Sequence, residues 1–310
     1  KETLKVKKNK FVIKLLSVLA VSSLAFNSSA QSVDIDVVNN DVYEKSIESF
    51  DPTLFLQRTQ FVDYDFDGDG KADVAVRRPN TFFQYVLNSK DDSILREQFG
   101  RNVSDIPISG DFDGDGKADV AVRRPRDHFW YIKNSSGTDL ITGNSDGITR
   151  FSFGRNSGDI PVPADYDGDG ITDVAVRRPS NQFWYILNSS GVDNITNNDD
   201  GITRVRFGTQ EDDIPVVEDY DGDGKADLAV RRPGTQFWYV RNSSGVDAAT
   251  GNSDGITRLR FGLQETDIAV PADYDGDGKA DFAVRRPSNF FWYIKNSSGT
   301  DSRTNADDGI

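Results

Sequence analysis

The sequence predicts an all-β fold, a β-propeller built from four-stranded blades of about 54 residues each. Three observations support this prediction: an acidic motif at a nearly fixed spacing, short segments rich in β-branched and aromatic residues without a helical period, and an aromatic triplet once per repeat. A period of this size is typical of propellers and solenoids. Four short strands per repeat make one propeller blade.

The acidic motif D-x-D-G-D-G-x-x-D defines the repeat. It begins at Asp65, Asp111, Asp165, Asp219 and Asp273, so successive copies are 46, 54, 54 and 54 residues apart. The first repeat is shorter because 88–100 replaces a longer segment equivalent to 134–154. The missing residues fall between the third and fourth predicted strands, where a loop tolerates a deletion.

The first 30 residues have the pattern of a secretory signal. Five lysines within 5–14 precede an apolar run at 15–26, and small residues at 28–30 suit cleavage after Ala30. The run is too short to span a bilayer comfortably. The alternative is an amphipathic or buried N-terminal helix. We therefore expect a secreted or cell-surface protein of bacterial origin, without an integral membrane span.

The rest of the chain divides into an N-terminal linker at 31–50 and the propeller at 51–310. Its repeats run approximately over 51–100, 101–154, 155–208, 209–262 and 263–310, the last of them truncated. In 209–262 the expected strands are IPVVEDYD, DLAVRRP, QFWYVRNSSG and GITRLRFG. Residue 1 is Lys and the last repeat stops at Ile310, so we expect a fragment of a larger propeller. The segment DPTLFLQRT at 51–59 is a candidate for the outer strand that the last repeat lacks.

An aromatic column runs through the repeats. Phe-Trp-Tyr recurs at 129–131, 183–185, 237–239 and 291–293, with Phe-Gln-Tyr at 83–85. Both faces of a blade are covered by neighbouring blades, so alternate residues of one strand can all be aromatic. Two interpretations remain for the tryptophans Trp130, Trp184, Trp238 and Trp292. We favour packing between blades, and the alternative is a stacking platform for sugar rings.

Each acidic motif is a candidate Ca²⁺ loop. Aspartates stand at positions 1, 3, 5 and 9, and glycines at positions 4 and 6 permit the tight bend that turns carboxylates toward one centre. Oxygen ligands without His or Cys suit Ca²⁺ better than Zn²⁺ or copper. The predicted ligands are these aspartates with the main-chain carbonyl at position 7: Asp65, Asp67, Asp69, Lys71 and Asp73; Asp111, Asp113, Asp115, Lys117 and Asp119; Asp165, Asp167, Asp169, Ile171 and Asp173; Asp219, Asp221, Asp223, Lys225 and Asp227; Asp273, Asp275, Asp277, Lys279 and Asp281.

We expect one Ca²⁺ per repeat, five in total. An EF-hand is excluded, because its bidentate Glu at position 12 is Val in every copy and the loop leads into strand-like residues. The alternative is a set of solvated acidic turns, since Asp-Gly is common in turns. Crowded carboxylates repel unless a cation neutralises them, and this favours the metal interpretation.

Charge and cysteine content narrow the function classes. The formal net charge is −14, and residues 1–30 hold six Lys and one Glu, so the remainder carries −19. This excess argues against nucleic acid or anionic lipid as a partner. The sequence contains no Cys, which excludes disulfides and thiolate metal sites. Five Ca²⁺ ions would bring the charge of the mature chain to about −9 and would take the stabilising place of cystine.

The order of motifs resembles the FG-GAP or VCBS-type repeat of integrin-α-like propellers. The Phe-Gly dipeptide stands at 99–100, 153–154, 207–208 and 261–262, each upstream of an acidic loop. The Gly-Ala-Pro of the family name is replaced by Arg-Arg-Pro at 77–79, 123–125, 177–179, 231–233 and 285–287. The resemblance covers about 51–310. Integrin heads have seven blades, whereas five acidic loops are visible here.

The Arg-Arg-Pro segments form a second candidate site. Strand order puts them at the end opposite the acidic loops, and the resemblance implies that this end is the ligand face. The candidate residues are Arg123, Arg124, Arg177, Arg178, Arg231, Arg232, Arg285 and Arg286, which could bind carboxylates or sulfates. The alternative, which we favour, pairs them with Glu211, Asp212, Asp213, Glu265 and Asp267.

We therefore expect a monomeric, secreted, calcium-binding propeller that acts as an adhesion or interaction module for an extracellular protein or surface polysaccharide. The first alternative is a lectin with one sugar site per blade. A propeller glycosidase is disfavoured because it needs a unique carboxylate pair. Few acids here are unrepeated, among them Glu44, Glu48, Glu97 and Glu218, and His128 is the single histidine. We expect no enzymatic activity.

Overall fold

The computed structural model describes residues 34–38, 41–45, 65–139, 143, 145–193, 195–196, 200–247 and 253–300. Every regular element in these ranges is a β-strand. The predicted signal segment at 1–30 and the candidate outer strand at 51–59 lie outside the described residues. The chain forms two compact units, residues 1–59 with 286–291 and residues 60–285 with 292–310.

The first unit contains a two-stranded hairpin. Strand β1 (Asp34–Val38) pairs antiparallel with β2 (Asp41–Lys45), and Val38 lies opposite Asp41. Regular structure is therefore present in the range that the sequence predicts as a linker.

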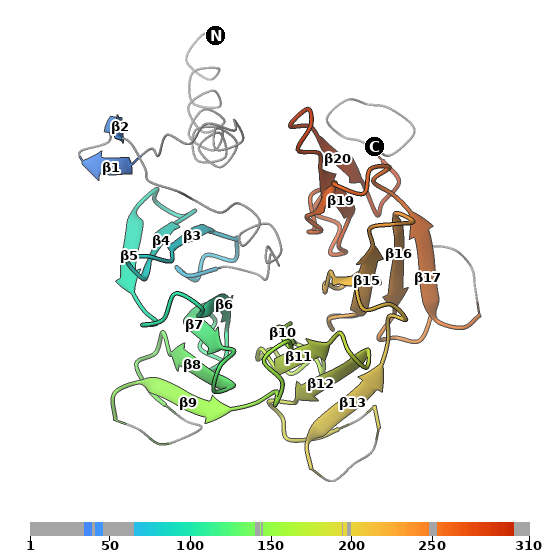
Figure 1. Ribbon diagram of the computed structural model, residues 1–310, viewed down its shortest axis with the longest axis horizontal. Helices are drawn as coiled ribbons and strands as arrows, with labels where there is room; N and C mark the ends of the chain where they lie inside the picture. Colours follow the sequence, from blue (N-terminus) through green and yellow to red (C-terminus); the bar gives the residue numbers. More distant parts are fainter. Residues whose placement is uncertain are drawn as a thin grey trace. The chain divides into compact units, whose positions relative to one another are not determined.

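The second unit contains five antiparallel sheets arranged as the blades of a β-propeller (Figure 1). Each sheet is formed by strands that follow one another in the sequence, so the colour in Figure 1 changes from sheet to sheet. The sheets are β3 (Val74–Arg78), β4 (Phe83–Leu87) and β5 (Ile94–Gln98); β6 (Ile106–Gly110), β7 (Asp119–Arg124), β8 (Phe129–Lys133) and β9 (Ile148–Ser152); β10 (Ile160–Pro161), β11 (Val174–Arg178), β12 (Phe183–Leu187) and β13 (Ile202–Arg206); β14 (Ile214–Pro215), β15 (Leu228–Arg232), β16 (Phe237–Arg241) and β17 (Ile256–Arg260); β18 (Ile268–Ala269), β19 (Phe282–Arg285) and β20 (Trp292–Lys295).

The predicted four-stranded blade is confirmed in the three middle sheets. The first and last sheets show three strands each within the described residues. In the first sheet β4 connects to β5 through 88–93, whereas in the second β8 connects to β9 through 134–147. The shortening of the first repeat therefore removes residues from this connection and leaves both strands in place.

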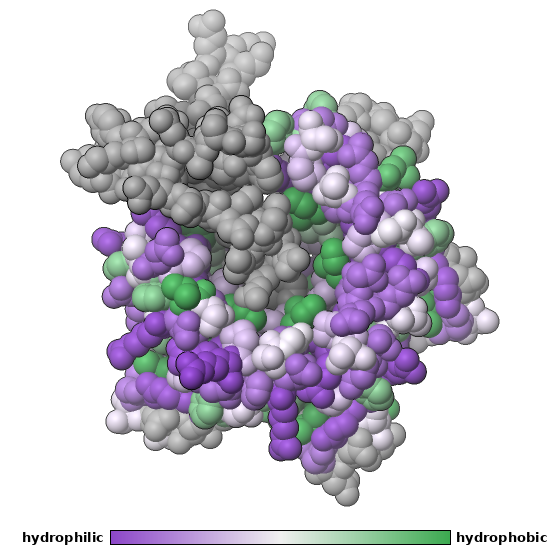
Figure 2. Space-filling model, viewed as in Figure 1, coloured by the Kyte–Doolittle hydropathy of each residue, from purple (hydrophilic) through white to green (hydrophobic). Residues whose placement is uncertain are grey.

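Side-chain alternation places the core between neighbouring sheets. Along β16, Trp238 and Val240 are fully buried while Phe237 and Tyr239 are half-buried. In β15, Leu228, Ala229 and Val230 are all buried, because a strand inside a propeller blade is covered on both faces. One apolar cluster joins Trp184 of β12 to Val230 of β15, so the core lies across the junction of two blades. The visible surface over the described residues is mainly hydrophilic (Figure 2).

In the three middle blades, the buried tryptophan also binds the segment that follows the fourth strand. The indole Nε1–H of Trp184 donates to the carbonyl of Phe207 at 3.0 Å, and Trp238 donates in the same way to Phe261 at 3.1 Å. Trp130 repeats the arrangement and is likewise fully buried, whereas Trp292 is partly exposed. This burial favours the packing interpretation over a platform for sugar rings.

Candidate metal centres

Each acidic loop is shaped by its own first aspartate, and the last four loops connect the first and second strands of their blades. In the loop 219–227, the carboxylate of Asp219 accepts hydrogen bonds from the amides of Gly222 at 2.6 Å and Gly224 at 2.9 Å. Both glycines have left-handed backbones, with φ of 78° and 85°. Glycine adopts this conformation without the steric penalty of a β-carbon, so the D-G-D-G sequence itself produces the tight bend.

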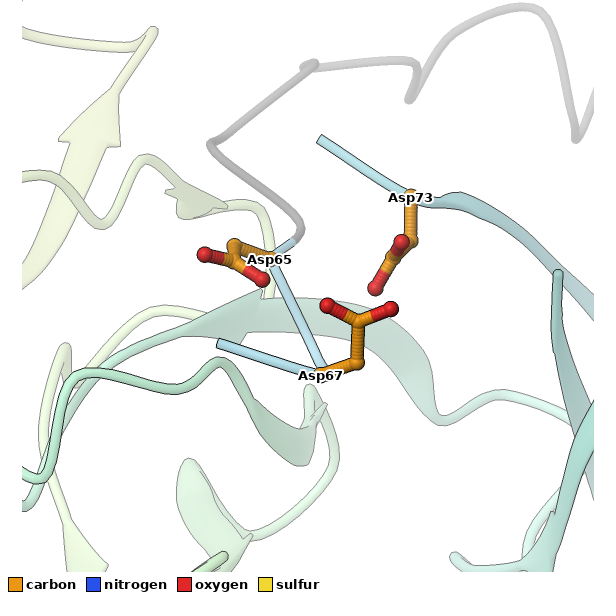
Figure 3. A group of neighbouring side chains, drawn as sticks. All are labelled: Asp65, Asp67 and Asp73. Carbon is orange, nitrogen blue, oxygen red and sulfur yellow. The ribbon is translucent and has the colours of Figure 1, made fainter. Parts of the chain in front are cut away.

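The bend brings three carboxylates of each loop together. In every group, one carboxylate oxygen from each residue lies within 4.8 Å of the others. Figure 3 shows the carboxylates of Asp67 and Asp73 facing one another, with one oxygen of Asp65 directed toward them. The groups are Asp65, Asp67 and Asp73; Asp111, Asp113 and Asp115; Asp165, Asp167 and Asp173; Asp219, Asp221 and Asp227; Asp273, Asp275 and Asp281.

The fourth predicted carboxylate of each loop lies outside these groups. In four loops it is the aspartate at position 5, and in the second loop it is Asp119 at position 9. The carboxylate of Asp169 instead accepts a hydrogen bond from the hydroxyl of Ser189 at 2.9 Å. The structure therefore shows three converging carboxylates per loop where the sequence predicts four.

The aspartate at position 9 is the most deeply placed acid of the loop. Asp119, Asp173, Asp227 and Asp281 are fully buried, and within the described residues none of them pairs with a lysine or arginine. The carboxylate of Asp227 accepts hydrogen bonds from the amides of Tyr220 at 2.8 Å and Ser243 at 2.6 Å. Burial raises the pKa of Asp119, Asp173 and Asp227 to about 7, although these amide hydrogen bonds act in the opposite direction.

Serine hydroxyls from a turn later in the chain donate hydrogen bonds to the loop carboxylates. These serines are not among the residues predicted from the sequence. The hydroxyl of Ser243 donates to Asp223 at 2.8 Å, and that of Ser244 donates to Asp221 at 2.6 Å. Both belong to the Asn-Ser-Ser-Gly turn, where the amide of Gly245 also donates to the carbonyl of Asn242. The second and third sheets repeat these contacts with their own serine pairs. The constant spacing between this tetrapeptide and the acidic loop was the available signal.

The donor set fits a hard divalent cation. Each group offers carboxylate oxygens from an acidic loop, and no His or Cys takes part. A buried carboxylate without a cationic partner is unfavourable unless a positive charge is supplied, and a bound Ca²⁺ supplies it. The aspartates at positions 1 and 3 would hold the ion together with the aspartate at position 9, except in the second loop, where Asp115 at position 5 takes that place.

In the first four Arg-Arg-Pro segments, the first arginine lies inside a blade junction. Arg123, Arg177 and Arg231 have no exposed surface. Arg177 donates to the carbonyl of Asp213 at 2.9 Å and to that of Gln210 at 2.8 Å, both in the connection to the next blade. These buried guanidinium groups bind main-chain carbonyls and so tie one blade to the following one.

In the three middle blades, the second arginine pairs with an acid that precedes the first strand of its own blade. Arg232 donates to both carboxylate oxygens of Asp213, at 2.7 and 2.9 Å, and its guanidinium lies 4.7 Å from the ring centroid of Tyr239. Arg124 with Asp105 and Arg178 with Asp159 repeat the pair. Asp213, one of the acids predicted as partners of the arginines, thus makes two contacts. Its carboxylate binds Arg232 and its carbonyl binds Arg177.

The Phe-Gly dipeptide packs into the same junction. Gly208 has φ of 76°, and a β-carbon placed on it would lie 3.2 Å from both Val230 and the Asp213 carboxylate. A residue larger than glycine at this position would therefore force apart Arg177, the Asp213 carboxylate and strand β15 of the next blade. The dipeptide, the acidic loop and the Arg-Arg-Pro segment form one repeated unit.

These features define a repeat β-propeller with an acidic loop in each blade. The family model described as the FG-GAP-like repeat matches the chain four times, over 65–122, 111–176, 165–230 and 219–284. Together the matches run from 65 to 284, well over half of the sequence. The chain belongs to the family of FG-GAP-like repeat proteins, as the motif order predicts. Membership of this family supports a general role as a protein-interaction module.

Two solved structures show distant similarity. A crystal structure of BBS1N in complex with ARL6DN, soaked with lead, has 12% identity and a TM-score of 0.35, covering 75% of this chain and 65% of that chain. A crystal structure of a protein from Lactobacillus plantarum has 11% identity and a TM-score of 0.31, covering 86% of this chain and 78% of the other. Similarity at this level supports no statement about binding or activity. No curated protein matches the sequence.

Proposed function

We propose that the protein is a secreted, calcium-stabilised β-propeller that acts as an adhesion or interaction module. One observation carries the calcium part of this proposal: in each of five repeats, three aspartate oxygens from one short loop converge within 4.8 Å. Carboxylates this close repel one another, and a bound cation removes the repulsion. Five similar loops whose carboxylates all converge are best explained by a bound cation.

Calcium is the cation that this site favours. Ca²⁺ accepts carboxylates and main-chain carbonyls in flexible geometry, whereas Mg²⁺ demands near-ideal octahedral positions and Zn²⁺ prefers nitrogen and sulfur. The carbonyl at position 7 is the natural further ligand. Extracellular calcium modules commonly work at about 10⁻⁴–10⁻³ M, so the affinity need not be high.

In four of the five blades the ion stabilises the fold through the second strand, because the position 9 aspartate is one of the converging acids. Asp227 at position 9 stands directly before β15 and forms a β-bridge with Glu218 at the start of the blade. Asp219 and Asp221 belong to the bend that precedes it. A cation held by these three aspartates joins the bend to the strand and takes the role that a disulfide has in other secreted domains.

The partner that we propose is an extracellular protein or a surface polysaccharide. Interaction rather than catalysis is supported by the repetition of the acids, since a glycosidase needs two carboxylates that differ from their repeats. A lectin with one site per blade is less well supported, because three of the four tryptophans are fully buried. We propose no enzymatic activity.

Secretion is supported by the sequence of residues 1–30, which lie outside the described residues. Their basic start, short apolar run and small residues at 28–30 are the features of a cleavable signal, and we propose cleavage after Ala30. Within the described part of the chain, no helix has the length and apolar character needed to cross a membrane.

The proposal is tested by thermal unfolding of the secreted protein in about 1 mM Ca²⁺ and in EDTA. We expect the melting temperature to fall sharply in EDTA and to recover when Ca²⁺ is returned in excess, because a ligand that binds only the folded state stabilises it. Mg²⁺ at the same concentration is the control and should restore less. An unchanged melt in EDTA, in protein shown to have contained calcium, would refute stabilisation by the ion.

A further inference from the structure

The acidic loops of consecutive blades touch one another in a fixed direction. The amide at position 8 of one loop donates a hydrogen bond to the main-chain carbonyl at position 1 of the preceding loop. This contact occurs four times at 2.7 Å, from Ala118 to Asp65, Thr172 to Asp111, Ala226 to Asp165 and Ala280 to Asp219. The residue at position 1 is one of the three converging aspartates, so each following loop holds a predicted ligand of the loop before it.

A side-chain contact accompanies this hydrogen bond. The residue at position 7 of one loop lies against the glycine at position 4 of the preceding loop. A β-carbon placed on Gly222 would lie 2.9 Å from Cγ of Lys279, and one placed on Gly168 would lie 2.9 Å from Cε of Lys225. In the third loop Ile171 takes the place of the lysine and packs on Gly114, so the contact depends on the aliphatic part of the side chain and not on its charge.

We infer that each of the first four acidic loops is held in its ion-binding shape by the acidic loop that follows it, so that residues 7 and 8 of one loop are positioning residues for the site before. This inference rests on the proposed calcium function. It follows that binding at neighbouring sites is coupled, because an ion that orders one loop also fixes the amide and side chain that support the preceding one. Among the described residues nothing lies within 4 Å of a β-carbon on Gly276, so the loop 273–281 lacks the side-chain contact.

The chain supplies a matched pair of glycines for a test. Gly222 and Gly276 occupy position 4 of their loops and have φ of 78° and 80°. Alanine therefore strains both backbones to the same extent. The two positions differ in one respect: a new methyl group meets Lys279 at Gly222, whereas it meets none of the described residues at Gly276. The difference between Gly222→Ala and Gly276→Ala isolates the contact between loops.

The experiment titrates the full secreted chain and both variants with Ca²⁺, using calorimetry for affinity and equilibrium dialysis for the number of ions. In Gly276→Ala we expect one site to weaken through backbone strain alone. In Gly222→Ala we expect the Ca²⁺ affinity of one site to be about tenfold lower than in Gly276→Ala, because overpacking displaces the following loop from Asp219. Adding Lys279→Gly to Gly222→Ala should return the affinity to the value of Gly276→Ala.

Equal calcium affinities in the two single variants would overturn the inference while leaving the proposed calcium function intact. Failure of the unmodified protein to take up Ca²⁺ would instead overturn the proposed function. In that case the contact between loops is still tested by the melting temperatures of the metal-free variants. A lower value for Gly222→Ala than for Gly276→Ala supports positioning, and equal values overturn it.

Discussion

Replacing Trp184 with alanine tests whether the aromatic column is structural. The indole is fully buried in a cluster that includes residues of two neighbouring blades, and its N–H donates to the Phe207 carbonyl at 3.0 Å. Truncating a buried Trp costs about 3–5 kcal/mol of unfolding free energy. The same change at Trp292, which is partly exposed, should cost about 1–2 kcal/mol, since less apolar surface is lost.

The assay is urea unfolding followed by circular dichroism, with both variants compared in saturating Ca²⁺. A parallel titration with surface polysaccharides, monitored by tryptophan fluorescence, addresses the lectin alternative. Equal losses of stability at the two positions, or a Trp184→Ala protein as stable as the parent, would refute the packing argument. A stable Trp184→Ala protein that no longer responds to a glycan would support a sugar platform instead.

Three further predictions concern the blade junctions and the acidic loops. Asp213→Ala should lower the unfolding free energy by about 2–4 kcal/mol in urea titrations, because it leaves Arg232 without its buried partner; the matched change at Asp254, which forms a solvent-exposed pair with Arg258, is the control and should lower it much less. In metal-free protein the melting temperature should rise as the pH falls from about 8 to about 5, whereas Ca²⁺ affinity should weaken over the same range. Ser244→Ala should reduce Ca²⁺ affinity about 10–100-fold in calorimetry, since its hydroxyl orients Asp221.

The sign of the pH prediction follows from the aspartates at position 9. The pKa of Asp119, Asp173 and Asp227 is raised by burial to about 7 in the folded protein, above the ordinary value of 3.8, so the folded state binds protons more tightly than the unfolded state. This contribution to stability is present at low pH and is lost as the pH rises through about 7. Ca²⁺ requires the ionised form, so its binding has the opposite dependence. If the melting temperature without metal and the Ca²⁺ affinity changed in the same direction with pH, this account would be contradicted. Equal losses of unfolding free energy for Asp213→Ala and its control would contradict the argument about the blade junction. An unchanged Ca²⁺ affinity in Ser244→Ala would contradict the role of its hydroxyl.

Local signals in the sequence were sufficient to predict the blade. Glycines with positive φ produce the acidic bend, and the alternation of Trp238 and Val240 with half-buried aromatics follows from strand geometry. Each of these features depends on residues that are close together in the chain. The strand order and the place of the deletion in the first repeat could therefore be predicted correctly.

Contacts between distant segments could not be predicted in the same way. The adjacent arginines Arg231 and Arg232 point to opposite faces of β15, and only the register, in which Arg231 lies opposite the buried Trp238, shows which of them is enclosed. The carboxylates at positions 3 and 5 of the acidic loop accept hydrogen bonds from serines of a turn about 20 residues later. Motif spacing indicated an acidic cluster but not which three of its aspartates converge.

The central claim is that the clustered aspartates bind a cation that stabilises each blade. Equilibrium dialysis of the secreted protein against Ca²⁺, with ion content measured by atomic absorption, tests it most directly. The account predicts uptake of one ion per acidic loop, five per chain, and loss of one ion when Asp227 is replaced by alanine. Absence of stoichiometric uptake at millimolar Ca²⁺ would contradict it.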